Sequence, residues 1–301
     1  MSNSEALSTA KQSPKFSVAI STTGYKNLIN NTLGDPERAK RFIASITSAV
    51  AVNPQLQDCD AGTILAGALL GESLNLSPSP QLGQYYLVPF KSKAKYDKQG
   101  NVIQPETARA QFILGYKGYI QLAVRSGQYK KLNVLEIKEN ELIRFDPLNE
   151  EIECDLIDDY EAREGAQTIG YYAMFEYING FRKAIYWSRE KMMAHADTFS
   201  PAYSAAAHKK LQAGEIPDKD KWKYSSFWYK NFDDMAKKTM LRQLISRWGI
   251  MSTELQQAFI QDSTLAEVGD ANEIVITPEE QLQFSQPEAT DVVEQVDLSS
   301  L

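Results

Sequence analysis

The chain has 301 residues, 43% of them hydrophobic, with 32 basic and 39 acidic side chains. Its two cysteines, Cys59 and Cys154, lie far apart, which excludes a disulfide framework and a thiolate metal site and fits a reducing cytoplasm. The N-terminus lacks an apolar signal core and the most apolar stretch is too short to span a bilayer, so we expect a cytoplasmic protein without a membrane segment.

Charge is distributed unevenly along the chain. No Lys or Arg follows Arg247, whereas the last 54 residues hold 11 of the 39 acids. The preceding part therefore carries 32 bases against 28 acids, a net charge of +4. Such asymmetry favours a polyanionic ligand for the body and a protein partner for the acidic tail.

The first half of the chain predicts an arm, two helices and two strands. Residues 1–30 show no lasting periodicity and are expected to be a flexible N-terminal arm. An Asp-Pro pair at 35–36 is a helix start signal, and the apolar spacing after it continues to Val50. The next helix follows Asp60 and is apolar on nearly every side, so it should be buried. In chain order, the predicted elements are helix 36–50, helix 61–74, strand 83–90 and strand 109–116.

The second half predicts antiparallel strands between helices. Its clearest signal is Asn179-Gly180, a dipeptide typical of a tight hairpin turn. In chain order, we predict a helix ending near residue 127, strands near 132–137, 152–156, 168–178 and 181–187, and helices at 189–196, 226–248 and 253–261. Residues 200–223 are expected to form a loop. The class is therefore α+β, with a core over 31–262 and an acidic, largely disordered tail over 263–301.

Few side chains suggest catalysis. The two histidines, His195 and His208, have no cysteine or carboxylate at zinc-ligand spacing, and no phosphate-loop motif for ATP occurs. Residues 136–164 contain 12 acids, which leaves two interpretations: the carboxylates of a metal-dependent nuclease, or a solvated acidic face. We favour the solvated face because these acids are spread along strand edges and loops. We therefore expect no catalytic centre, metal or cofactor.

The segment 115–128 has a polar stripe and an apolar side. At helical spacing, Lys117, Gln121, Arg125 and Gln128 share the stripe, and the opposite side should pack in the core. Lys117 lies in the first turn, where the helix dipole disfavours a cation and where free amides can bind a phosphate. The stripe is either part of a nucleic-acid site or an ordinary solvated face.

The segment 209–247 combines 10 basic and 5 acidic residues with several aromatic rings. Cations for phosphates and rings for base faces are typical of single-strand binding, although the rings could instead be core and the lysines solvated. On the predicted helix over 226–248 the apolar stripe changes sides, from Trp228 and Phe232 to Leu241 and Leu244. This helix should therefore be covered on two sides, by its own core and by a neighbouring layer or subunit.

Three segments in register resemble the RecT family of phage-type single-strand annealing proteins. They are Gly71–Pro78 with Gly83–Phe90, Gly115–Gln128 and Asp234–Leu244, and their order also matches. The resemblance covers about residues 35–259. It implies that the protein binds single-stranded DNA, assembles into rings or helical filaments, and anneals complementary strands without ATP. A passive single-stranded DNA-binding protein without annealing activity is the alternative.

The resemblance also implies a fold and partners. The fold would place a bent antiparallel sheet and packed helices around a basic DNA-binding groove. An exonuclease and the host's single-stranded DNA-binding protein would act beside it in the bacterial cell.

Nine residues are expected to contact DNA. The resemblance indicates Lys117, Arg125, Lys237, Lys238 and Arg242, and the basic and aromatic stretches add Lys209, Lys210, Tyr116 and Trp228. The family often has arginine where this chain has Lys117, so the charge is kept but the bidentate phosphate fork is lost.

Overall fold

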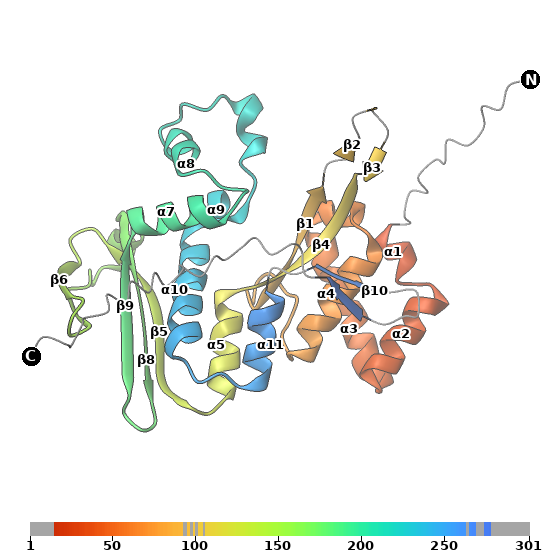
Figure 1. The fold of residues 1–301 in the computed structure, drawn as a ribbon, viewed down its shortest axis with the longest axis horizontal. Coiled ribbons are helices and arrows are strands. Elements are labelled where there is room, and N and C mark those ends of the chain that lie inside the picture. Colours follow the sequence, from red (N-terminus) through yellow and green to blue (C-terminus); the bar gives the residue numbers. More distant parts are fainter. Residues whose placement is uncertain are drawn as a thin grey trace, which may run out of the picture.

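The structure is a computed structural model, and it describes residues 15–92, 95–96, 99, 102–104, 106–262, 265–268 and 274–277. Helices and antiparallel strand pairs are distributed over an elongated molecule (Figure 1). Every strand pairing among these residues is antiparallel. The predicted α+β class is therefore confirmed.

The N-terminal half is built around one buried helix. In chain order its elements are α1 (Phe16–Ala19), α2 (Thr23–Leu33), α3 (Pro36–Val52), η1 (Pro54–Asp58) and α4 (Ala61–Ser73). The Asp60 carboxylate accepts hydrogen bonds from the first amides of α4, and all residues of α4 from Ala61 to Gly71 are buried. Asp35 caps α3 in the same way. Both predicted helix starts are thus confirmed.

The prediction of a flexible arm over 1–30 is wrong for its second half. α1 lies within this segment and α2 begins there, and Phe16 and Ile29 are 1% and 0% exposed in the N-terminal core. Isolated apolar residues in a Ser- and Thr-rich sequence gave no lasting periodicity, yet they suffice to anchor the helices. Residues 1–14 lie outside the described residues.

A two-stranded ladder packs on α4. Strands β1 (Tyr85–Ser92) and β4 (Thr107–Leu114) pair from Tyr85 opposite Leu114 to Ser92 opposite Thr107. The short strands β2 (Lys95–Tyr96) and β3 (Val102–Gln104) extend the same hairpin. Alternation along β1 buries Tyr85 and Leu87 against α4 and turns Tyr86 to the other side. β4 then leads through Gly115 into α5 (Tyr116–Arg125).

The second half contains a three-stranded sheet in the order β5-β8-β9. Its strands are β5 (Tyr129–Lys138), β8 (Thr168–Tyr177) and β9 (Arg182–Ser188), and the last two form the predicted hairpin with Gly180 at φ +87°. Between β5 and β8 lie β6 (Leu142–Asp146), β7 (Glu151–Cys154) and α6 (Tyr160–Gly165). β6 and α6 were not predicted. α7 (Arg189–Phe199) follows the sheet.

The long predicted helix over 226–248 is two helices. α9 (Phe227–Lys230) ends at Asn231, and α10 (Phe232–Trp248) begins directly after it. α10 lies between α5 and the three-stranded sheet (Figure 1). Leu241 and Ile245 pack in the N-terminal core, whereas Phe232, Ala236, Met240 and Leu244 pack in a second core against the sheet. The prediction of two buried sides is confirmed, and the covering comes from this chain.

Two further regions differ from the prediction. The loop predicted over 200–223 contains α8 (Ala205–Gln212) and η2 (Asp218–Lys223). After α11 (Thr253–Gln261), the tail predicted as disordered contains the paired strands β10 (Leu265–Val268) and β11 (Ile274–Thr277). The rest of the tail lies outside the described residues. Among the helices of the described chain, none is long and apolar enough to cross a membrane.

Candidate nucleic-acid interface

A cleft of about 390 Å³ lies where the end of α3, the loop before β1, the start of α5 and α9 meet. Its lining includes the rings of Tyr86, Tyr116 and Phe227 and the side chain of Lys117. The Tyr86 and Phe227 ring centroids are 5.4 Å apart. The cleft thus combines aromatic faces with a cation, the combination that single-strand binding uses.

Two glycines fix the helix that forms one wall of this cleft. A Cβ on Gly115 would lie 2.2 Å from the carbonyl oxygen of Gly83, and a Cβ on Gly118 would lie 2.1 Å from that of Gln84. Residues three apart share a helix face, so both glycines lie against the start of β1. This contact leaves Tyr116 and Lys117 for the cleft. In the Gly-Tyr-Lys-Gly motif the two glycines therefore serve packing, whereas the half-buried Tyr116 and the exposed Lys117 line the cleft.

Two ammonium groups lie near the ring of Tyr116. The Lys117 Nζ is 5.9 Å from the Tyr116 ring centroid, and the Lys237 Nζ is 4.7 Å from it. Lys117 is exposed, and no carboxylate pairs with it in the described part of the chain. Because α5 begins at Tyr116, the positive end of its dipole also lies at the cleft. Asp234 also lines the cleft, but its charge is paired with Lys237, so Lys117 and the helix end are the positive groups left for a phosphate.

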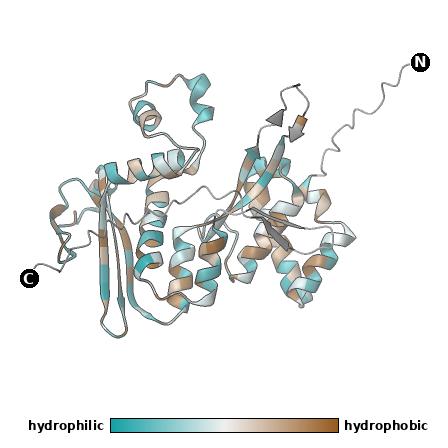
Figure 2. Ribbon diagram, in the orientation of Figure 1, coloured by the Kyte–Doolittle hydropathy of each residue, from teal (hydrophilic) through white to brown (hydrophobic). Residues whose placement is uncertain are grey.

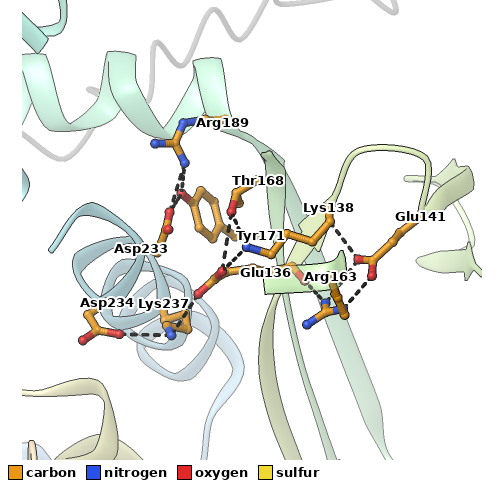
Figure 3. A network of polar contacts seen from close by, with 10 residues as sticks. All are labelled: Glu136, Lys138, Glu141, Arg163, Thr168, Tyr171, Arg189, Asp233, Asp234 and Lys237. Carbon is orange, nitrogen blue, oxygen red and sulfur yellow. Dashed lines mark hydrogen bonds and ion pairs between the residues drawn. The ribbon is translucent and has the colours of Figure 1, made fainter. Parts of the chain in front are cut away.

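Lys237 has its charge compensated within the protein. Its Nζ lies 3.1 Å from Glu136 Oε1 and 3.0 Å from Asp234 Oδ1 (Figure 3). Burial lowers the pKa of Lys237, but the hydrogen bonds and charges of Asp234 and Glu136 outweigh this effect and raise the pKa above its usual value. Lys237 therefore stays charged and links α10 to β5.

The same polar network continues across the sheet. Glu136 accepts a hydrogen bond from Lys138 at 2.9 Å, and the buried Glu141 pairs with Arg163. On α10, Asp233 accepts hydrogen bonds from Tyr171 and Arg189 (Figure 3). Most other acids of residues 136–164 are exposed. Within the described residues, no group of three or more His, Cys, Asp and Glu side chains is placed to hold a metal ion.

Lys238 and Arg242 converge on a buried carboxylate. The Asp262 side chain, 1% exposed, lies 2.9 Å from Lys238 Nζ and 2.8 Å from Arg242 Nη1. It also accepts hydrogen bonds from the Leu114 amide and from the Tyr119 hydroxyl at 2.9 and 3.0 Å. Burial raises the pKa of Asp262, but the charges of Lys238 and Arg242 lower it further, and the net shift is downward. Asp262 thus connects the end of α11 to α10 through the two cations, and to β4 and α5 through Leu114 and Tyr119.

The remaining predicted residues lie apart from the cleft. Arg125 donates hydrogen bonds to the carbonyl oxygens of Leu74 and Asn75 just beyond α4, at 2.9 and 2.7 Å. Trp228 is buried in the second core. Lys209 and Lys210 are exposed on α8, which lies in a projection beyond α7 and α9 (Figure 1). The structure thus does not bring the nine residues together in one basic groove.

Two aromatic residues of the cleft are not among the nine residues expected to contact DNA. Tyr86 and Phe227 come from β1 and α9, which meet only in the folded chain. Alternation along β1 was the one available signal for Tyr86, because it places this ring opposite the buried Tyr85. A narrower apolar pocket shares both rings and Tyr116 with the cleft and has Lys238 in its lining. Lys238 therefore lies between the cleft and Asp262.

Comparisons with known proteins agree with the motifs at this site. The sequence profile of the RecT family matches residues 40–277, which include every residue of the cleft. The chain belongs to the RecT family. This RecT-family chain is 38% identical over 239 residues to the protein YqaK of Bacillus subtilis (strain 168), described as uncharacterized; the match covers 79% of the chain and 69% of YqaK.

A second RecT-family relative is Protein RecT of Escherichia coli (strain K12). It is 26% identical over 225 residues, which cover 74% of the chain and 71% of that protein. The RecT family comprises phage-type recombination proteins of the single-strand annealing class, and the chain is assigned to that class.

Proposed function

We propose that the chain binds single-stranded DNA and anneals complementary strands without ATP, as a homo-oligomeric ring or filament. The observation that carries this proposal is the cleft, where Tyr86, Tyr116 and Phe227 offer ring faces beside the uncompensated charge of Lys117. Rings stack with any base, and a lysine binds any phosphate, so such a surface holds DNA without reading its sequence. Family membership supports the same activity.

The chemistry of annealing fits a site without a catalytic centre. Duplex formation is downhill, with stacking of about 1.4 kcal/mol per base-pair step. The obstacles are repulsion between phosphates and the slow search for the correct register. Cations that neutralise phosphates and a scaffold that keeps a strand extended reduce both obstacles without a nucleophile, a general base or a nucleotide cofactor.

The proposal also includes the protein partners of the chain and its location in the cell. A single strand must be exposed before it can be annealed, so an exonuclease and a host single-stranded DNA-binding protein are the expected partners, in the bacterial cytoplasm. We place the annealing core between Phe16 and Asp262, because both residues are buried in contacts with the rest of the fold.

The proposal is tested by an annealing assay. Two complementary oligonucleotides with a donor and an acceptor dye are mixed with and without the protein, in the absence of nucleotide and metal. We expect pairing at least tenfold faster with the protein, and electron microscopy of the mixture should show rings or filaments. Binding of one strand without faster pairing would show a passive single-stranded DNA-binding protein instead. Absence of binding would overturn the proposal.

A further inference from the structure

The projection over residues 200–226 has a buried inner side and an exposed outer side. On the inner side, the Tyr203 ring lies 5.1 Å from Tyr229, and the His208 ring lies 5.2 Å from Phe232. Tyr203 and His208 are 6% and 3% exposed. The residues of η2 in this projection are hydrophilic (Figure 2). The aromatic contacts thus hold the projection to the body and leave η2 facing solvent.

Trp222 is the exception on this hydrophilic surface. It lies in η2 with 72% of its surface exposed, and the residues on either side of it are Lys221 and Lys223. Tryptophan is usually highly buried because its apolar area is large. The Lys223 Nζ lies 5.9 Å from the centroid of this ring.

The lysines around Trp222 are available to an anion. Lys221 pairs with Asp218 and Lys223 with Asp220, each at 2.7 Å, but these pairs are exposed and such pairs contribute little. Lys219 is exposed too, and it forms no ion pair with another described residue. A phosphate can therefore replace the carboxylates at small cost.

We propose that Trp222 is a stacking platform for a base of single-stranded DNA, with the lysines of η2 on the adjacent phosphates. This inference rests on the proposed function and extends its binding path. Three residues after Trp222 separate it from Ser226, the N-cap of α9, and the next residue, Phe227, is a wall of the cleft. A strand that enters the cleft can thus continue onto the projection.

The composition of this surface favours a nucleic acid over a protein partner. Protein interfaces use tryptophan as an anchor, but their cores are depleted in lysine. Here three lysines lie within three residues of the ring, at 219, 221 and 223. Base stacking beside cations uses both residue types together.

The test compares Trp222→Ala with Trp222→Phe in the full-length protein. Fluorescence anisotropy of a dye-labelled oligodeoxythymidine reports affinity, and sedimentation velocity without DNA reports assembly. We expect W222A to bind about tenfold more weakly, because removal of one stacking ring has an effect of this order, and W222F to stay within about threefold of the wild type. Tyr160→Ala is the matched control, since Tyr160 is an aromatic residue 75% exposed on the acidic side of the molecule.

Each outcome has a distinct meaning. W222A with wild-type affinity overturns the stacking site alone. A changed assembly state without DNA, with unchanged affinity per subunit, shows that a second copy of the chain covers Trp222 and also overturns it. Failure of the wild-type protein to bind the oligonucleotide overturns the proposed function itself.

Discussion

Lys117 lines the cleft, and in the described part of the chain it forms no ion pair with a carboxylate. The neighbouring Tyr116 ring is contacted by the ammonium groups of Lys117 and Lys237. Replacement of Lys117 by alanine should remove one phosphate contact. The slope of log affinity against log salt is negative, and for single-stranded DNA it should become less steep by about 0.7. Lys117→Arg should keep the slope. Titrations at four or more salt concentrations measure it.

A control separates this local effect from the loss of net charge. Lys26→Ala removes the same charge from an exposed position of α2 that is not part of the lining of the cleft. Its slope should equal that of the wild type. Equal slopes for Lys117→Ala and the wild type would show that DNA does not contact this lysine.

Asp262 is expected to stabilise the folded protein. In Asp262→Asn the buried ammonium group of Lys238 loses its counter-ion, and a buried ion pair that loses one partner costs on the order of 3 kcal/mol. Urea denaturation of this variant should show that loss. Glu139→Gln, an exposed acid, is the control and should change the free energy of unfolding by less than about 0.5 kcal/mol.

The same carboxylate predicts a pH dependence. Its pKa is lower in the folded protein than the value of about 3.9 in an unfolded chain, so the folded state binds the proton less tightly. The stabilisation is therefore complete above about pH 5 and is lost as the pH falls through 3.9 toward the folded pKa. Between pH 6 and pH 3 the free energy of unfolding should fall less steeply in Asp262→Asn. Parallel curves for the two proteins would contradict this assignment.

Helix α5 depends on a close approach that only glycine allows. Gly118→Ala would place a Cβ 2.1 Å from the Gln84 carbonyl oxygen, a backbone atom that cannot turn away. The helix must shift from β1, which should cost about 2 kcal/mol or more and disturb the cleft wall. Thermal and urea unfolding measure the loss, and DNA affinity should fall with it.

Gly24→Ala is the matched substitution for comparison. Gly24 is a helical glycine in α2 with no atom within 4 Å of an added Cβ. Alanine there should stabilise the protein by about 0.5 kcal/mol, because it restricts the unfolded chain without a clash. Similar losses in both variants would mean that helix conformation, and not the contact with β1, explains the effect.

The elements that the sequence predicted well are those with local signals. The caps at Asp35 and Asp60 and the Asn179-Gly180 turn depend on neighbours within three or four residues, and all three lie where predicted. The interruption at Asn231 and helix α8 were missed, because aromatic contacts between distant segments fix them. Packing of this kind overrides weak local propensity.

The residues of the candidate site also differ in how far the sequence alone could indicate their role. Lys117 is unusual in the sequence because the first turn of a helix is a poor place for a cation, and in the structure it lines the cleft. No sequence signal indicated that Lys238 is buried, because its partner Asp262 lies beyond the next helix. A lysine on a helix face appears identical in sequence whether a carboxylate or a phosphate will meet it. Spacing alone therefore cannot assign such residues to DNA.

At the scale of the whole molecule, basic residues are confined to the part of the chain before Trp248, whereas acidic residues continue to the C-terminal part. The body before Trp248 has a net charge of +4, and all later ionisable side chains are acidic. The first acids of this C-terminal part belong to the fold, since Asp262 is buried and β10 and β11 follow it. Only the acids beyond Thr277 can be removed without loss of a described element.

Deletion of residues 278–301 should therefore accelerate DNA binding. The deletion removes six acids and no bases, so the net charge rises from −7 to −1. Repulsion of the DNA backbone decreases, and the association rate at about 50 mM salt should rise severalfold. The gain should vanish near 1 M salt, where the screening length is about 3 Å. Stopped-flow fluorescence with a labelled oligonucleotide measures the rate.

A second variant distinguishes charge from the chain itself. It keeps all 301 residues but replaces the six acids with asparagine and glutamine, so its net charge equals that of the deletion variant. If electrostatic repulsion slows the wild type, both variants bind at the same increased rate and share one salt dependence. If only the deletion accelerates binding, the polypeptide itself competes with DNA for the body, and uncharged residues of the tail are its contacts. Equal rates for all three proteins leave the acidic tail free for a protein partner, since DNA association is then independent of it.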